Sequence, residues 1–230
     1  EVCVCIGNHD YEYKKELEDG SNSIEIRAEF KNFSNRFITV DTEIVSSDRV
    51  SLKKLRENVF YLSIDSTLGS HLPALVGKPG KIEPKEIDFI VTDVIKKHVP
   101  VNAILLIGCH YPIVHFPNAF IEVDEPNWSE KHFWSQAQFL RSRINKIEGV
   151  TKFWFLGDSH SPDHLIFETA YFVMTGKFGG TTLVDKIEKV SHINRQCKLI
   201  TINNSNIEAI TFNYEMETHV DSAMHGIWHK

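Results

Sequence analysis

The chain has 230 residues, of which 42% are hydrophobic and 24% are charged, and its formal net charge at pH 7 is −6. This size supports one sizeable core, and no linker or low-complexity tract interrupts it, so we expect a single domain over residues 1–230. The negative charge disfavours a general nucleic-acid binder, because such proteins present positive surfaces to phosphates. The most apolar run, VNAILLIGCHYPIVHF, contains histidines and a proline that a bilayer core does not tolerate unpaired, so we expect no membrane span.

Cysteine usage bears on the compartment. The four cysteines, at positions 3, 5, 109 and 197, have no CxxC spacing and are too few to staple a chain of this length. Cys3 and Cys5 share one face of a predicted strand, where a direct bond between them would be strained. We interpret all four as buried thiols in a reducing compartment, and since no signal peptide opens the chain we expect a cytoplasmic protein.

The predicted elements begin with a strand, VCVCI, at residues 2–6. Residues 11–51 are polar and less regular, so we expect loops and short elements there, and we interpret KKLR at 53–56 as a solvated turn. VFYLSID at 59–65 is a short apolar run that ends in a carboxylate, which predicts a buried strand. The next element is a helix over residues 83–98, with Pro84 in its first turn and one apolar stripe made by Ile87, Ile90, Val91, Val94 and Ile95.

The second half of the chain continues the alternation. AILLIGC at 103–109 and KFWFLGD at 152–158 predict two more buried strands, and an amphipathic helix over 129–147 lies between them with Ser129 as its N-cap. YFVM at 171–174 predicts a strand beside KFWFLGD. Two alternating apolar runs around NNSN, within residues 197–215, predict a β-hairpin.

Three predicted strand ends carry residues of the kind that bind metals. They are GNHD at residues 7–10, GCHYP with His110, and GDSHSP with Asp158 and His160. Each begins with a glycine, which lets the backbone turn sharply and approach a ligand closely. In α/β enzymes the ligands gather beyond the carboxyl ends of the strands, so we expect these clusters to meet at one edge.

The order of these motifs resembles one family. GNHD, YLSIDST, GKIEPKEIDFI, LLIGCHYP and WFLGDSHSP follow one another as the corresponding elements do in the calcineurin-like metallophosphoesterases, from Val2 to about Gly180. The resemblance implies an α/β (α+β) fold in which two mixed β-sheets pack as a sandwich and are flanked by helices. It also implies a metal-dependent phosphoesterase that hydrolyses a phosphate mono- or diester of a small molecule or nucleotide.

The resemblance assigns roles to six residues. Asn8, His110 and Asp158 would bind one divalent ion, and His160 would bind a second. His9 would be the general acid that protonates the leaving oxygen, and Asp10 would orient it. The two ions, drawn from Mn, Fe, Zn and Mg, would hold a hydroxide and the phosphoryl oxygens for in-line attack.

Two departures from the family pattern leave alternatives open. Asp158 stands where the family usually has a histidine, so either its carboxylate coordinates, which favours harder ions, or one ligand is lost. The family's upstream DxH and GDxxD elements are missing from this sequence. Either an N-terminal segment or a second chain completes the site, or this is a catalytically silent binding or scaffolding domain; a nuclease is the third alternative. We expect the chain alone to bind one ion weakly or none.

Overall fold

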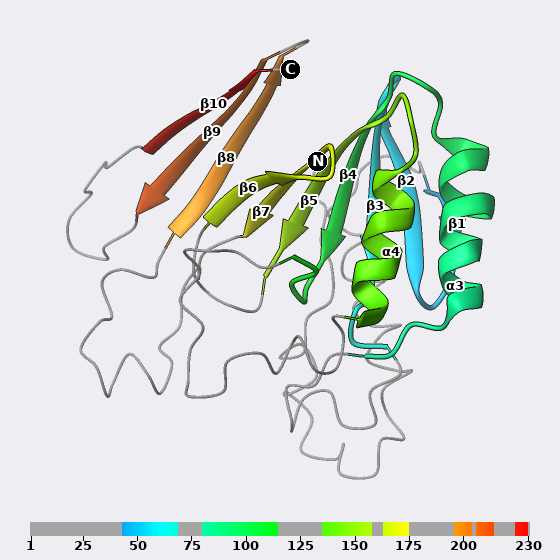
Figure 1. Ribbon diagram of the computed structural model, residues 1–230. Helices are drawn as coiled ribbons and strands as arrows, with labels where there is room; N and C mark the ends of the chain where they lie inside the picture. The colour runs from blue at the N-terminus through cyan, green and yellow to red at the C-terminus, as the bar shows by residue number, and fades with distance from the viewer. Residues whose placement is uncertain are drawn as a thin grey trace, which may run out of the picture. The chain divides into compact units, whose positions relative to one another are not determined.

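A computed structural model describes residues 43–68, 80–114, 135–157, 163–174, 196–203, 206–213 and 224–229 (Figure 1). Contacts divide the chain into two compact units. The prediction of a single domain over residues 1–230 stays a prediction.

The larger sheet has seven strands and is mixed. Its spatial order is β1 (Glu43–Ser46), β2 (Val50–Arg56), β3 (Val59–Ile64), β4 (Ile104–Cys109), β5 (Thr151–Leu156), β7 (Ala170–Met174) and β6 (Asp163–Phe167). The pairs β1–β2 and β2–β3 are antiparallel, whereas β3–β4 and β4–β5 are parallel. The three strands predicted from apolar runs at 59–65, 103–109 and 152–158 are therefore confirmed, and YFVM lies beside KFWFLGD as predicted.

Two helical crossovers connect the parallel strands. The first is α3 (Pro84–Asp88), which continues as the π-helical turns η3 (Phe89–Lys96), and the second is α4 (Ser135–Asn145). They lie on the same face of the sheet (Figure 1), as right-handed crossovers between strands added in one direction require, and Arg143 of α4 pairs with Asp88 at 2.8 Å. The predicted N-cap Ser129 lies outside the described residues.

The first helix starts and buries its face as its sequence predicts. Pro84 occupies its first turn, and the Glu83 N–H donates to the Glu86 carboxylate at 2.7 Å, which completes a capping box. All five residues of the predicted apolar stripe are buried, namely Ile87, Ile90, Val91, Val94 and Ile95. The spacing of the apolar residues therefore correctly predicts both the helix and the face of it that is buried.

The core is centred on the parallel strands, which are buried on both faces, as parallel strands usually are. Large side chains without exposed surface include Leu62, Leu105, Ile107 and Phe153. Cys109 is a buried thiol whose Sγ donates to the Tyr111 carbonyl at 3.5 Å, which confirms the buried-thiol interpretation for this cysteine. The other three cysteines lie outside the residues whose side chains are described.

The interpretation of KKLR as a solvated turn is wrong. Lys53 to Arg56 belong to β2, which pairs with β1 on one side and with β3 on the other, and the Lys53 side chain is buried. Pairing on both sides outweighs the charge pattern, because a lysine's methylene stem can pack along apolar neighbours. The four-residue strand β1 is one of the short elements expected within residues 11–51, whereas β6 was not predicted.

The smaller sheet has three strands, β8 (Gln196–Asn203), β9 (Asn206–Asn213) and β10 (Met224–His229), in the order β10-β9-β8. β8 and β9 form the predicted hairpin around NNSN. Both described pairings are antiparallel. The expectation that this sheet is mixed is therefore wrong for the described strands. Packing of the two sheets as a sandwich stays a prediction.

No helix in the described ranges is long and apolar enough to cross a membrane.

Candidate functional site

The three parallel strands end level with one another. Ile64, Cys109 and Leu156 are partners in the register, and each is the last residue of its strand. The next residue along each strand is Asp65, His110 or Gly157. Because neighbouring strands lie about 4.8 Å apart, these three positions form one row at the carboxyl edge of the sheet.

His110 is held in this row by both its backbone and its ring. Its carbonyl accepts the Gly157 N–H at 2.8 Å, so the pairing of β4 with β5 extends one residue beyond the strands. Its imidazole is half-buried and meets the Tyr111 ring edge-on, with 5.0 Å between ring centroids. A Cβ placed on Gly157 would lie 3.2 Å from His110 Nδ1, so the glycine leaves room for the imidazole.

The carboxylate of Asp65 serves the turn that follows β3. Its Oδ1 accepts the backbone N–H of Thr67 at 2.8 Å, the Thr67 hydroxyl at 2.5 Å and the Leu68 N–H at 3.1 Å. This is the arrangement of an Asx turn, which the sequence Asp-Ser-Thr after an apolar strand favours. The turn directs the chain away from the sheet directly beside His110.

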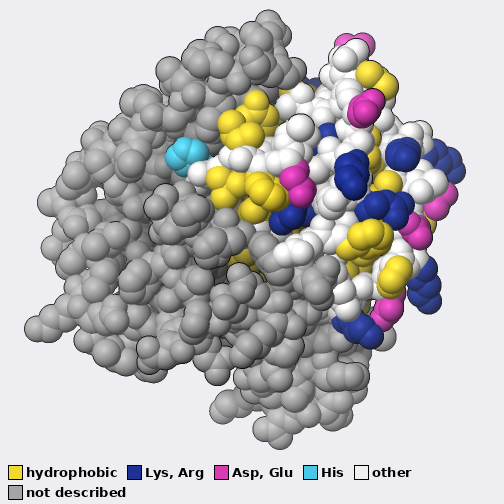
Figure 2. All heavy atoms as spheres, in the orientation of Figure 1, with side chains coloured by type: hydrophobic (Ala, Val, Ile, Leu, Met, Phe, Trp, Pro, Cys, Tyr) yellow, Lys and Arg dark blue, Asp and Glu magenta, His cyan; other side chains and the backbone are white. Residues whose placement is uncertain are grey.

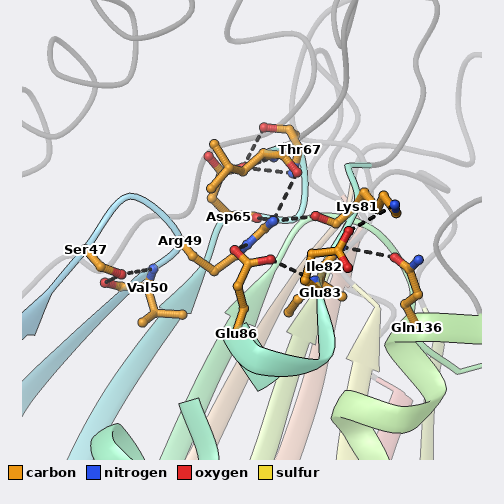
Figure 3. A network of polar contacts seen from close by, with 11 residues as sticks. Ser47, Arg49, Val50, Asp65, Thr67, Lys81, Ile82, Glu83, Glu86 and Gln136 are labelled. Carbon is orange, nitrogen blue, oxygen red and sulfur yellow. Dashed lines mark hydrogen bonds and ion pairs between the residues drawn. The ribbon is translucent and has the colours of Figure 1, made fainter. Parts of the chain in front are cut away.

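Arg49 also holds the turn that follows β3 (Figure 3). Its guanidinium donates to the carbonyls of Asp65 at 2.7 Å and Leu68 at 3.1 Å, to the Lys81 carbonyl, and to Glu86 Oε1 at 3.2 Å. Only 7% of Arg49 is exposed, so this is a buried charge with a paired carboxylate. It joins the exit of β3 to the start of α3.

Ser66 connects the turn to the residue after His110. Its Oγ accepts the backbone N–H of Tyr111 at 3.1 Å, and its own carbonyl accepts the Gly80 N–H at 2.7 Å. Ser66 has no exposed surface. Sequence reasoning did not single out Ser66 or Arg49, although Asp-Ser-Thr is a usable turn signal.

Of the six predicted site residues, the structure describes His110 alone. Asn8, His9, Asp10, Asp158 and His160 lie outside the described residues, and Asp158 directly follows Gly157 in the chain. Among the residues that are described, no group of three or more His, Cys, Asp or Glu could hold a metal ion. The chemistry of His110 is compatible with the role, because imidazole nitrogen suits Zn and Fe, and the side chain is half-buried at a strand end beside a glycine.

The opposite, amino edge of the sheet has an open cavity of about 590 Å³. Two of the polar residues that line it form buried hydrogen bonds: Lys152 Nζ donates to the Asn145 carbonyl at 2.9 Å, and Asn145 Oδ1 accepts from Trp154 Nε1 at 3.1 Å. Arg141 forms two bonds with the carboxylate of Glu168, at 3.2 and 3.3 Å. Asn145, Lys152 and Glu168, which line the cavity, therefore already have hydrogen-bond partners within the protein.

Comparisons with known proteins add little to this geometry. No family model matches the chain, and no curated protein matches it. One match among solved structures is a single mutant of Vps29 from Entamoeba histolytica, with 14% identity and a TM-score of 0.28, covering 74% of this chain and 98% of that one. A TM-score this low establishes no shared fold, so what is established is a mixed α/β architecture.

Proposed function

We propose that this chain is a metal-dependent phosphoesterase domain that hydrolyses a phosphate mono- or diester of a small molecule or nucleotide. One observation supports the proposal above the others. His110 of the GCHYP motif lies at the carboxyl edge of the sheet, where three parallel strands end at the same level. Its carbonyl accepts a hydrogen bond from the N–H of Gly157, the residue before Asp158. The first glycine of GDSHSP therefore lies beside His110 of GCHYP, which supports a shared site.

In this proposal His110, Asn8 and Asp158 would hold one divalent ion, and His160 would hold a second. When bound, such ions would supply Lewis-acid chemistry and a nucleophile at neutral pH. A net-negative chain can bind phosphate in this way, because bound metals are the largest local charges.

His9 donates a proton to the leaving oxygen, and Asp10 orients its imidazole. His9 directly follows the ligand Asn8, and side chains of adjacent extended residues point in opposite directions, so His9 would face the substrate and not the ion. A positioned acid of this kind accelerates a reaction by about 10²–10⁴.

A catalytically silent binding domain is the second candidate. The DxH and GDxxD elements that would supply the bridging carboxylate are not found within residues 1–230. A nuclease has less support, because positive and negative side chains are interspersed over the described part of the face in Figure 2.

The test compares His110, at the carboxyl edge of the sheet, with His98, which follows η3 and is also half-buried. His110→Ala and His98→Ala are each titrated with Mn²⁺, and hydrolysis of p-nitrophenyl phosphate is measured beside the binding. We expect His110→Ala to lose Mn²⁺ binding and turnover, and His98→Ala to keep both. An unmodified chain that binds neither Mn²⁺ nor Zn²⁺ at millimolar concentration would refute the metal site and leave the silent domain.

His9→Ala separates the acid from the ligands. It should keep its metal and lose turnover, and the loss should be smaller for aryl phosphates, whose leaving groups need no proton. A His9→Ala chain stripped of metal, or equally slow on alkyl and aryl esters, would show that His9 is not the acid.

A further inference from the structure

We infer that Ser66 is a positioning residue that fixes the direction in which the His110 side chain leaves the backbone. The inference rests on the proposed function, because it takes His110 to be a metal ligand. It concerns a residue to which the resemblance assigns no role, and it comes from the bonds around one peptide group.

That peptide group joins His110 to Tyr111, and it is held on both sides. Its carbonyl accepts the Gly157 N–H from the β5 side at 2.8 Å. Its N–H donates to Ser66 Oγ on the β3 side at 3.1 Å. A peptide plane anchored at both polar atoms cannot rotate about its long axis, so the backbone dihedrals beside it, ψ of His110 and φ of Tyr111, are restrained.

The Ser66 hydroxyl takes the place of a β3 backbone carbonyl as a hydrogen-bond acceptor beyond the end of the strand. The partners Ile64 and Cys109 end their strands together, so two residues further on Ser66 is level with Tyr111. The Asx turn has by then directed the β3 chain away, and the Ser66 carbonyl accepts the Gly80 N–H instead. The side-chain oxygen therefore supplies the acceptor for the Tyr111 N–H at this level of the sheet.

The position of that oxygen is itself fixed. Asp65 Oδ1 holds the turn through three bonds, and Arg49 holds the carbonyls of Asp65 and Leu68. Ser66 is fully buried, so water does not compete for its hydroxyl. The rigidity of the turn is thus transmitted to the backbone of His110 through one hydrogen bond.

Removal of the hydroxyl should release one side of this peptide group. Metal ligands need support of this kind, and loss of an outer group that orients a ligand typically lowers metal affinity 10- to 100-fold. We therefore expect Ser66→Ala to raise the Kd for Mn²⁺ by about 10- to 100-fold.

Two further variants separate positioning from stability. Ser66→Thr keeps the hydroxyl but adds a methyl group to a fully buried site, which should destabilise the fold. Asn145→Ala removes a buried hydrogen bond at the amino edge, the one from Trp154 Nε1. If Ser66 acts by positioning, both variants should unfold at lower urea and still bind Mn²⁺ more tightly than Ser66→Ala.

The experiment measures three quantities on the unmodified chain and the three variants: the urea midpoint, the Kd for Mn²⁺, and amide hydrogen exchange at Tyr111 without metal. We expect exchange at Tyr111 to be about tenfold faster in Ser66→Ala, as for the loss of one hydrogen bond, and unchanged in Asn145→Ala. If Mn²⁺ affinity follows the urea midpoint across the variants, or if exchange at Tyr111 is unchanged, the inference about Ser66 is overturned and the proposed function is not. An unmodified chain that binds no metal overturns it together with the proposed function.

Discussion

The two edges of the parallel strands use their buried polar side chains in different ways. At the carboxyl edge, Arg49, Asp65 and Ser66 bond mostly to backbone groups, and they hold a turn beside the half-buried imidazole of His110. At the amino edge, the carboxylate of Glu168 accepts bonds from the side chains of Arg141 and Asn145, and Lys152 donates to two backbone carbonyls. The carboxyl-edge bonds hold a turn beside an imidazole, whereas the amino-edge bonds join the end of α4 to β5 and to the turn between β6 and β7.

This difference shows why the amino-edge cavity is the weaker pointer to function. Its walls come from the end of α4, the start of β5 and the β6–β7 turn. The carboxylate of Glu168 accepts bonds from Arg141 and Asn145, and the Lys152 ammonium donates to two carbonyls at the end of α4. Such contacts satisfy the polar ends of a helix and a turn, which is a stabilising role.

The largest effect should follow from removing the buried charge at the carboxyl edge. Arg49→Ala leaves Glu86 and three carbonyls without this donor, so we expect the free energy of unfolding to fall by about 3 kcal/mol or more. Arg143→Ala is the matched control, because its ion pair with Asp88 is well exposed and should contribute at most about 1 kcal/mol. Urea denaturation measures both, and equal losses would show that burial of Arg49 does not matter.

The sequence predicted the elements that local patterns determine. The stripe from Ile87 to Ile95 repeats at helical spacing, and apolar runs that end in Gly or Asp located β3, β4 and β5. Contacts made far along the chain have no such signal. The partners of Arg49 are 16 to 37 residues away, and Tyr111 is 45 residues from Ser66.

The candidate site was predictable to the same extent. His110 could be placed at a strand end, because Gly-Cys-His follows an apolar run and predicts the end of β4. The hydrogen bonds that hold its backbone could not be predicted, because they depend on a register in which β3, β4 and β5 end level. That register is set by the whole sheet.

The next effect concerns the lysine at the amino edge. Lys152→Met keeps the length of the side chain but leaves the carbonyls of Asn145 and Ile147 without their donor, so we expect a loss of about 1–3 kcal/mol in unfolding free energy. Lys146→Met, on an exposed neighbour that lines the same cavity, should change little.

This lysine also predicts a pH dependence with a definite sign. Burial lowers the pKa of Lys152 below its usual 10.5, so the unfolded chain binds more protons than the folded chain between the lowered pKa and 10.5. The unmodified chain should therefore gain stability as pH rises through this window. The deficit of Lys152→Met should therefore widen as the pH rises toward 10.5. A deficit that narrows would mean that the ammonium form is the one the fold favours.

The smallest effect should be a gain in stability, at the turn between β6 and β7. Glu168 and Thr169 form this two-residue turn with φ values of 47° and 66°, a region that favours glycine and disfavours a β-branched side chain. Glu168 is held there by Arg141, whereas the Thr169 hydroxyl has only a long contact, 3.5 Å, to the Asn145 carbonyl. Thr169→Gly should thus relieve more strain than it loses in bonding. Because glycine also loses more entropy on folding, we expect a net gain of about 0.5–1 kcal/mol.

The control for this turn is Thr151→Gly, in the β5 strand, where glycine should destabilise by a similar amount because no positive φ is relieved. Thermal or urea unfolding of the two variants gives opposite signs if the turn is strained. A loss of stability in Thr169→Gly would mean that the threonine side chain contributes more to the Glu168 and Asn145 network than its backbone strain costs. The amino edge would then be built as tightly as the turn beside His110, and the contrast between the two edges would rest on the Arg49 and Lys152 variants.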